Sequence, residues 1–479
     1  MQSFKIIAVF CALTTLTGCA VRRYRPLPLS PAQTAASLKA RSLADPGLRA
    51  FIAKLQAAPA TWPLAEWSLA DLTLAAFYYN PALAIARGHL SEAEAAIVTA
   101  GARPNPSVKA DLGGESARES PWIAGFGFSL PIETAGKRRY RISQAERLAD
   151  VARWDLTSTA WKVRAQVRTA LVEYLAAKRN VSLLEDEERL GAEQVALLEQ
   201  RFAVGMIPRP EVDTARIQHT QTLLAVRAAE GRISQAEASL AAAIGVPTAA
   251  LKGVKIVWPS FDQPPSPASL HPATIQEDAV LNRLDIRRGL ADYSAAEAAL
   301  QLEIAKQYPD FDLGPDYAFE EGTHLFSVSL GLTLPVFNRN QGPIAEAQAR
   351  RDQVAAQFIG VQASGIADSE QALAKYSAAM NQLAEARRLM QQSVTQEQAT
   401  EKALEAGESD RVALNGTQLQ AAVIAVAQLD TLFSAQQALG DLENAVQPTV
   451  VGHRCDSQIA AYQPGEVNRP GIARPTALG

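Results

Sequence analysis

Two long stretches of the chain carry apolar residues at alternating steps of four and three. In the first, from about Lys137 to Val204, these positions are Val163, Val167, Ala170, Tyr174, Ala177, Val181, Leu184, Val195, Leu198 and Phe202. Glu188 and Gly191 interrupt the rhythm. A repeat of about 3.5 residues is typical of a coiled-coil seam and not of a globular helix face. The pattern predicts a helix of roughly 65 residues, about 100 Å long.

The second stretch keeps the same rhythm at Leu373, Tyr376, Met380, Leu383, Met390 and Val394, with Arg387 as the exception. Four shorter helices are predicted at roughly Leu64–Arg103, Arg209–Val246, Ser269–Gln307 and Arg411–Val446. Each is just over half as long as a long helix. Two of them stacked end to end would therefore match one long helix.

Four segments between these helices alternate apolar and polar residues, namely Ser107–Leu112, Trp122–Leu130, Asp310–Glu320 and His324–Leu334. In the last segment Phe326, Val328 and Leu330 share one face, and Ser327 and Ser329 share the other. This period of two predicts strands. One apolar and one polar face is the pattern expected where lipid meets one side and water the other.

The chain contains an internal duplication with an offset near 200 residues. Pro104 corresponds to Pro309, Phe128 to Leu332 and Gly205 to Gly407. We divide the chain into a first repeat at 64–258, a Pro-rich linker at 259–272 and a second repeat at 273–447. The first repeat holds strands at about 107–130 and a turn at about 205–210. The second holds strands at about 310–334 and a turn at about 407–411.

Three of the four segments are long enough to cross a membrane, since a tilted strand needs about 9–11 residues, and Ser107–Leu112 can be extended through Gly113 and Gly114. After the N-terminal segment, no stretch has the roughly 18 consecutive apolar residues that a spanning helix needs. The smallest single-chain membrane barrels use about eight strands, and an open sheet edge in lipid leaves backbone groups unpaired. Four strands per chain therefore require an oligomer, whose size the strand count alone leaves open.

Residues 1–18 are predicted to be a signal peptide, with Lys5 before an apolar run that ends at Leu16-Thr17-Gly18-Cys19. These last four residues resemble a bacterial lipobox. The resemblance implies a signal removed before Cys19 and acyl chains attached at Cys19, which gives two-chain anchoring. Residues 19–63 would form an irregular, lipid-anchored segment, and we expect a disordered tail at 448–479. The alternative is an ordinary cleaved signal peptide.

Composition excludes several classes of function. A net charge of −4 over 479 residues gives no reason to expect a nucleic-acid partner. The five histidines are scattered without ligand spacing, so we predict no metal site. No cofactor is predicted either, because neither a P-loop nor a dinucleotide fingerprint occurs. No Ser-His-Asp order is present, and we predict that the protein is not an enzyme.

Two strand-to-helix junctions resemble a known family, the TolC-like outer-membrane efflux proteins. They are Phe128-Ser129-Leu130-Pro131-Ile132-Glu133-Thr134-Ala135-Gly136-Lys137-Arg138-Arg139 and Leu334-Pro335-Val336-Phe337-Asn338-Arg339-Asn340-Gln341-Gly342-Pro343-Ile344-Ala345-Glu346-Ala347. The resemblance covers roughly Leu64 to Val446. It is most similar to the branch that serves heavy-metal efflux pumps of the resistance-nodulation-division type.

The resemblance implies a mainly α protein with membrane β-structure. Each chain would give four strands to a trimeric, twelve-stranded β-barrel, which a long coiled-coil α-helical barrel continues. It also implies a homotrimer, lipid-anchored in the outer membrane and extending into the periplasm, with a periplasmic adaptor and an inner-membrane transporter as partners. The chain would be a passive exit duct for substrates, with heavy-metal cations as one candidate cargo. The substrate stays open at this point.

The family resemblance also assigns roles to individual residues. The hairpin tips that would dock on the adaptor contain Val204, Gly205, Pro208, Arg209, Ala406, Gly407, Asp410 and Arg411. A gate near these tips would involve Asp213, Asp410 and Asn415, although Asn415-Gly416 stands where relatives carry acidic residues. The alternating acids Asp310, Asp312, Asp316 and Glu320 would line the lumen of the barrel, where they attract cations or only hydrate the wall.

Two other readings stay open at this stage. A periplasmic adaptor lipoprotein also combines an acyl anchor with a helical hairpin, and a coiled-coil envelope lipoprotein needs no pore. Neither is expected to carry two hairpins and two apolar strand pairs.

Overall fold

The computed structural model describes residues 23–55, 61–114, 122–269, 275, 277, 280–320 and 323–447. The chain divides into two units, Met1–Arg41 and Ser42–Gly479. In the first unit, helix α2 (Pro31–Lys39) begins at Ser30, whose side chain accepts a hydrogen bond from the Gln33 backbone amide. Pro31 lies in the first turn, where proline favours a helix start.

The second unit begins with helices where the sequence predicted an irregular segment. Helix α3 (Pro46–Leu55) also starts at a proline, and α4 (Leu69–Tyr79) starts with a capping box between Ser68 and Asp71. The expectation of an irregular stretch over residues 19–63 is thus wrong for α2 and α3. Prolines were interpreted as helix breakers, whereas two of them begin helices.

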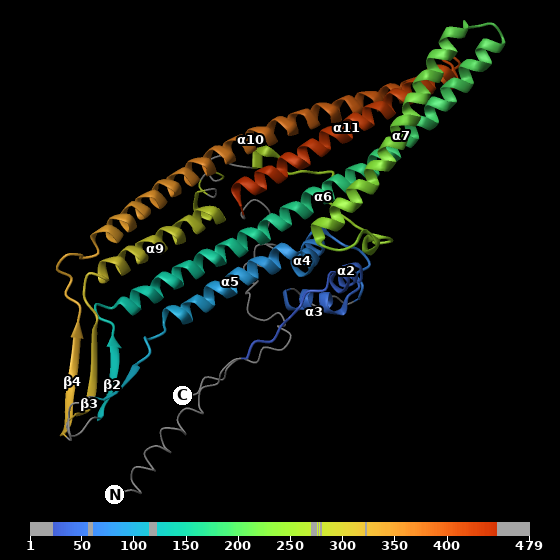
Figure 1. Ribbon diagram of the computed structural model, residues 1–479. Coiled ribbons are helices and arrows are strands. Elements are labelled where there is room, and N and C mark those ends of the chain that lie inside the picture. Colours follow the sequence, from blue (N-terminus) through green and yellow to red (C-terminus); the bar gives the residue numbers. More distant parts are fainter. Residues whose placement is uncertain are drawn as a thin grey trace. The chain divides into compact units, whose positions relative to one another are not determined.

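Four long helices of the second unit form two hairpins (Figure 1). Helix α6 (Lys137–Ala203) pairs with α7 (Arg209–Ile244), and α10 (Gln341–Glu405) pairs with α11 (Arg411–Val446). Helices α5 (Pro81–Ala100) and α9 (Leu284–Ala305) pack against the other halves of the long helices. The end-to-end stacking that the sequence predicted therefore occurs in both halves. Short 3-10 helices lie at Thr248–Leu251 and Pro267–Ser269.

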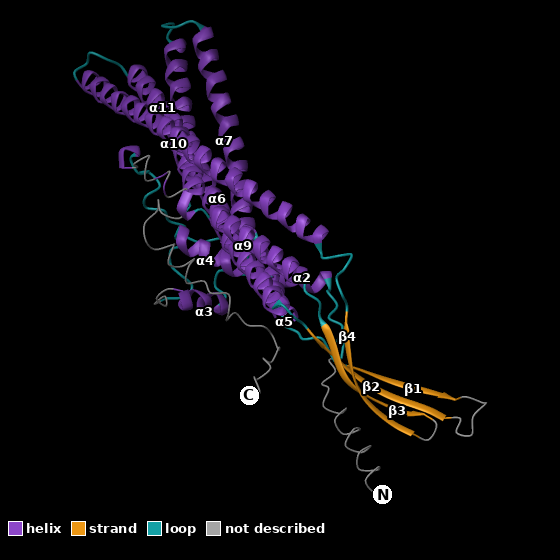
Figure 2. Cartoon of the chain, turned by 90° about the vertical axis from the view of Figure 1, so that its left-hand side faces the viewer, coloured by secondary structure: helices purple, strands orange, loops and turns teal. Residues whose placement is uncertain are grey.

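The strands form one antiparallel sheet in the order β1-β2-β3-β4. They are β1 (Ser107–Gly114), β2 (Trp122–Ile132), β3 (Phe311–Glu320) and β4 (Thr323–Leu332). Figure 2 shows the sheet at one end of the second unit, with the turns of the helix hairpins at the opposite end. The predicted fold class, long helices with four strands in a duplicated chain, is confirmed.

Segment 258–266 lies across the helices of both halves. Phe261 is 6% exposed in the core of α10 and α11, and Gln436 Nε2 donates to its carbonyl oxygen at 2.6 Å. Arg387 Nη2 donates to the Asp262 carbonyl at 2.6 Å. Arg387, the exception in the second apolar seam, therefore has a structural role, because it binds segment 258–266.

Candidate functional site

The sheet separates apolar from polar side chains by register. Phe126 lies opposite Tyr317, and Tyr317 lies opposite Phe326. The positions that share this face are Val108, Ala110, Leu112, Ala124, Phe126, Phe128, Leu130, Ile132, Phe311, Leu313, Pro315, Tyr317, Phe319, His324, Phe326, Val328, Leu330 and Leu332. We call this set the apolar face. Successive side chains of a strand alternate between faces, so serines, glycines and acids lie on the opposite, polar face.

The apolar face is uncovered within one chain. Phe326 is 81% exposed and Val328 is 73% exposed. Among the described residues β1 pairs only with β2 and β4 pairs only with β3, which leaves one edge of each outer strand without a partner. Exposed apolar side chains and open strand edges both mark surfaces that must meet something other than water.

Pro315 lies at an interruption of the β2–β3 ladder. The pairs on both sides are Gly127↔Asp316 and Leu130↔Leu313, and the two positions between them are unpaired. Proline has no backbone N–H to donate, so it is accommodated where the ladder skips. Its neighbour Gly314 approaches the Phe128 carbonyl so closely that a Cβ would lie 1.5 Å from that oxygen. Glycine is therefore required at this position.

The four acids proposed for the lumen divide into two groups. Asp312, Asp316 and Glu320 lie in β3 on the polar face, and the Ser129 hydroxyl donates to Asp312 at 3.4 Å. Asp310 precedes the strand and accepts hydrogen bonds instead from the Thr134 amide and from Lys137 Nζ, both at 2.8 Å. It therefore joins β3 to the start of α6.

The junctions between strands and helices are fixed by long-range hydrogen bonds. The buried Lys137 also donates to the Tyr308 carbonyl at 2.6 Å. Arg141 forms an ion pair with Glu133 at 2.6 Å and donates to the Ala100 and Ala102 carbonyls at the end of α5. These groups satisfy carbonyls that the last turn of a helix leaves free. Helix α6 consequently starts from a fixed position beside the sheet.

The two hairpin tips end their first helix in the same way. Gly205 and Gly407 both have φ of +76°, in the left-handed region that glycine adopts without strain. Met206 N donates to the Arg201 carbonyl at 2.9 Å, and Glu408 N donates to the Ala403 carbonyl at 2.8 Å. This pattern is the Schellman ending of a helix. The predicted role of both glycines in the reversal thus has a conformational basis.

Other predicted tip residues flank these turns. Val204 is 69% exposed, and Ala406 and Arg411 are exposed. Pro208 is the N-cap of α7, and Arg209 forms an ion pair with Asp213 at 3.2 Å. The neighbouring Met206, which lies within the predicted turn at about 205–210, is 75% exposed.

The three proposed gate residues do not meet in one chain. Asp410 caps α11, accepting from Ala413 N at 3.0 Å, and forms an ion pair with Arg201 of α6. Asp213 lies along α7 between Arg209 and Arg216. Asn415 is 2% exposed, and its Nδ2 donates to the Leu190 carbonyl at 3.2 Å. Asp410 and Asn415 therefore connect the second hairpin to the first.

A buried charged cluster between α6 and α11 was not predicted from the sequence. Arg164 Nη1 and Arg168 Nε lie 3.1 and 3.3 Å from Glu443 Oε2, and all three side chains are at most 5% exposed. Arg168 also donates to the Gln436 carbonyl at 2.9 Å. Burial lowers the pKa of Arg168, and the Glu443 carboxylate opposes that shift. The cluster connects α6 of the first hairpin to the C-terminal end of α11 in the second.

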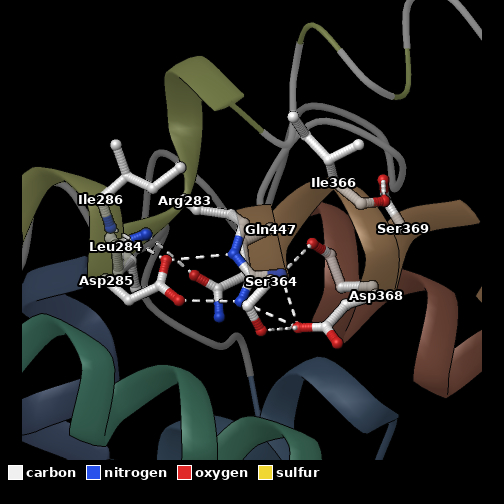
Figure 3. A network of polar contacts seen from close by, with 10 residues as sticks. Arg283, Leu284, Asp285, Ile286, Ser364, Ile366, Asp368, Ser369 and Gln447 are labelled. Atoms are coloured by element: carbon white, nitrogen blue, oxygen red, sulfur yellow. Dashed lines mark hydrogen bonds and ion pairs between the residues drawn. The ribbon is translucent and has the colours of Figure 1, made fainter. Parts of the chain in front are cut away.

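Arg283 forms a second unpredicted junction (Figure 3). Its guanidinium donates to Asp285 Oδ2 at 2.7 Å, to the Ala445 carbonyl at 3.0 Å and to Asp368 at 3.4 Å. The Leu284 amide donates to Gln447 Oε1 at 3.0 Å. The start of α9, the end of α11 and the middle of α10 thus meet at one side chain.

The described residues contain no group of three or more histidine, cysteine, aspartate or glutamate side chains that could hold a metal ion. Helix α11 is long and apolar enough to cross a membrane by length and composition, and 17% of its most apolar stretch is buried in the chain. Helix α11 packs along α10 and α6, and most of its apolar stretch is nevertheless not buried in the single chain.

Known proteins share this combination of sheet and hairpins. Residues 75–246 match the family described as outer membrane efflux protein. The match includes β1, β2 and the whole first hairpin, so it covers the first repeat from α4 to the end of α7.

One curated relative is the cobalt-zinc-cadmium resistance protein CzcC of Cupriavidus metallidurans. It is 26% identical over 279 residues, which is 58% of this chain and 65% of the relative. The chain thus spans less than two thirds of that protein.

Solved structures extend the similarity to the fold of most of the chain. A membrane protein from Pseudomonas aeruginosa has a TM-score of 0.64 at 20% identity, covering 79% of this chain and 90% of that one. CusC, whose structures concern transmembrane channel formation, has a TM-score of 0.63 at 17% identity and covers 79% and 91%. The chain has the fold of TolC-like outer-membrane proteins.

Proposed function

We propose that this chain is the outer-membrane channel subunit of a tripartite efflux pump and provides a passive exit duct. The observation that carries the proposal is the four-stranded sheet, with its uncovered apolar face and two open edges. A strand of ten residues extends about 33 Å, and a tilt of about 45° reduces this height to about 23 Å, close to the apolar band of membrane barrels. A soluble protein would cover such a face.

Closure of the sheet requires further copies of the chain. The open edge of β4 in one copy would pair with the open edge of β1 in the next, and three copies would supply twelve strands. The exposed apolar surface of α11 supports the same conclusion for the helical part, because it needs a neighbour outside the chain. We therefore infer a homotrimer.

The hairpin tips are proposed as the surface that docks on a periplasmic adaptor. Tip residues Val204 and Met206 are exposed apolar side chains at the end of the first hairpin. The adaptor would in turn connect the duct to an inner-membrane transporter of the resistance-nodulation-division type, which supplies the energy. Asp410 and Asn415, which tie the two hairpins together, are proposed to hold the closed state, with Asp213 of α7 as a third gate residue.

Heavy-metal cations are the proposed cargo. The curated relative is named for cobalt, zinc and cadmium resistance, and Asp312 and Asp316 give the polar face negative charge. A wide duct selects by width and wall charge, so no coordinating site is needed.

Anchoring through Cys19 is a separate proposal, and Cys19 lies outside the described residues. Two acyl chains would give stable attachment to the outer membrane. Radioactive palmitate should label the wild-type protein in cells and should not label Cys19→Ser. Label retained in that variant would contradict this proposal.

The channel proposal is tested by one pair of neighbouring residues. Arginine on the lipid side at the bilayer midplane costs roughly 2–4 kcal/mol, whereas a lumen position tolerates it. Val328→Arg, on the apolar face, should therefore prevent stable conductance steps in planar bilayers, and Ser327→Arg, on the polar face, should preserve them. Light scattering in detergent should give three copies for wild type. A monomeric wild-type protein or silent bilayers would refute the channel.

A further inference from the structure

The end of the sheet that meets the helices is strongly basic. Segments 101–106, 133–141, 306–310 and 333–341 contain seven lysine and arginine residues and two acids, a local net charge of +5 in a chain whose total is −4. At the opposite end, segments 115–121 and 320–322 carry four glutamates and one arginine in sequence. The basic charge therefore belongs to one end of the strands only.

Internal pairing explains only three of these seven cations. Lys137 pairs with Asp310, Arg141 with Glu133, and Lys306 with Glu303 of α9. The other four form no ion pair with a described residue, and all four are exposed: Arg103, Arg138, Arg139 and Arg339. We call them the junction arginines.

The junction arginines occupy three of the four crossings between helices and strands. Arg103 lies between α5 and β1, Arg138 and Arg139 follow β2, and Arg339 follows β4. Arg138 has one internal contact, because its Nε donates to the Gly101 carbonyl at the end of α5 at 2.7 Å. Helix stability does not explain the charges of Arg138 and Arg139, because cations in a first turn oppose the helix dipole, and the first turn of α6 contains no acid. A partner outside the chain accounts for them better.

Aromatic and apolar side chains lie beside the junction arginines. Phe337 is 98% exposed and Tyr308 is 59% exposed. The Arg139 guanidinium lies 5.0 Å from the Tyr140 ring centroid and donates to its hydroxyl at 3.2 Å. Exposed aromatic rings next to arginine are typical of the boundary between the apolar core and the headgroups of a membrane.

We propose that the junction arginines bind the phosphate groups of anionic phospholipids in the membrane leaflet nearest the helices. This inference rests on the proposed function, which puts the apolar face in lipid. The junction arginines directly follow that face, since Leu334 and Val336 continue from β4 toward Arg339 and are each 66% exposed. Guanidinium groups suit phosphate because several N–H donors match its oxygens. Clusters of basic residues at a membrane boundary prefer anionic lipid.

The test uses the purified oligomer in nanodiscs of phosphatidylethanolamine mixed with phosphatidylglycerol. Lipids that remain bound after detergent extraction are counted by mass spectrometry. Wild type should retain phosphatidylglycerol about five-fold or more above its share in the disc, on the order expected for a few cations at an anionic surface. The triple variant Arg138→Gln/Arg139→Gln/Arg339→Gln should lose this enrichment, and the corresponding triple lysine variant should keep most of it.

A matched control removes three exposed arginines on helices remote from the sheet, Arg189→Gln/Arg227→Gln/Arg388→Gln. It should retain phosphatidylglycerol as wild type does. Equal retention by the junction triple variant, with normal conductance steps, would overturn the lipid site alone. Absence of conductance from wild type would overturn the channel and this inference with it.

Discussion

Asn80 and Arg283 perform the same task in the two halves of the molecule. Each interrupts a helical segment with an extended backbone, at φ −69° and ψ 124° for Asn80 and at φ −58° and ψ 135° for Arg283. Asn80 Nδ2 donates to the Ala243 carbonyl at the end of α7, and Arg283 Nη1 donates to the Ala445 carbonyl at the end of α11, both at 3.0 Å. Each residue thus joins two stacked helices.

The two residues differ in how the new helix is capped. The Asn80 side chain also accepts from Ala82 N at 3.0 Å, so one amide serves both helices. Arginine has donors only. In the second half Gln447 and Asp285 therefore supply the acceptors, for Leu284 N and Ile286 N. Both halves thus have a hydrogen bond to the end of the stacked helix. In the second half, separate residues cap the helix that follows.

Replacement of Arg283 should separate the stacked helices of the second half. Arg283→Met removes the donor to Ala445 and the cation between Asp285 and Asp368, and we expect a loss of about 2 kcal/mol, as for a hydrogen bond involving a charged group. Hydrogen exchange at residues 443–447 measures the local effect. Arg227→Met, an exposed position, is the control and should leave this exchange unchanged.

Removal of Glu443 should be among the most damaging single changes in the helical part. Glu443→Gln leaves Arg164 and Arg168 buried without a carboxylate, which typically costs about 3–5 kcal/mol. The thermal midpoint followed by circular dichroism should fall markedly. The exposed counterpart Glu230→Gln, which affects only Arg227, should not shift it. Equal midpoints for both variants would show that the buried cluster contributes little.

Alanine at either tip glycine should disturb the local turn. Gly205→Ala and Gly407→Ala place a side chain at φ +76°, at a cost of about 1 kcal/mol, although the space around both sites is open. Asparagine tolerates this region better, so Gly205→Asn should fall between alanine and wild type. Amide exchange of Met206 and Glu408 reports the turn. Unchanged exchange in the alanine variants would argue against a conformational requirement.

Acid should weaken the link between the hairpins at their tips. The hydrogen bond from Ala413 N and the bond from Arg201 hold the pKa of Asp410 below its usual value of about 3.9. A carboxylate with a lowered folded-state pKa contributes stability above its unfolded pKa. That contribution is lost as pH falls through the folded-state value. The stabilisation should therefore decline below about pH 4.

Spin labels on α6 and α11 near the tip measure this effect as a change of distance with pH. Asp410→Asn should give a looser tip whose separation no longer depends on pH in that window. A wild-type separation that stays constant between neutral pH and pH 3 would contradict the expectation.

Loss of the polar-face acids should reduce the preference for cations. Asp312→Asn/Asp316→Asn removes two charges of each chain from the wall of the proposed duct. The reversal potential in a salt gradient should move toward zero, the value for a pore that does not distinguish cations from anions. Conductance steps should still be present. Asp310→Asn is an informative contrast, because Asp310 is occupied by Lys137 and Thr134, and its loss should affect stability more than selectivity.

Local patterns were sufficient to predict the strands and the long helices. The two-residue alternation of β4 and the 3.5-residue seam of α6 each repeat often enough to identify their element. The exceptions in the first seam also have partners. The Glu188 carboxylate accepts a hydrogen bond from His219 Nε2 at 2.7 Å, and Gly191 lies against His219. The residues that interrupt the apolar seam of α6 therefore contact the neighbouring helix α7.

Contacts between distant residues were not predictable in this way. Arg283 and Ala445 are 162 positions apart, and Arg164 and Glu443 are 279 apart, so no local pattern connects them. The break at Asn80-Pro81 did have a local signal, because the residue before proline avoids the helical region. The single helix predicted over Leu64–Arg103 should have been divided there.

The open edges of β1 and β4 have a consequence for how the protein is made. A newly synthesised subunit that formed its sheet in water would expose two unpaired strand edges and an apolar surface, and other polypeptides could bind to both. Hairpin formation must therefore coincide with entry into the bilayer and with the arrival of sister subunits. Maturation should accordingly depend on concentration, and a shortage of subunits should lead to their destruction before a partial ring can persist.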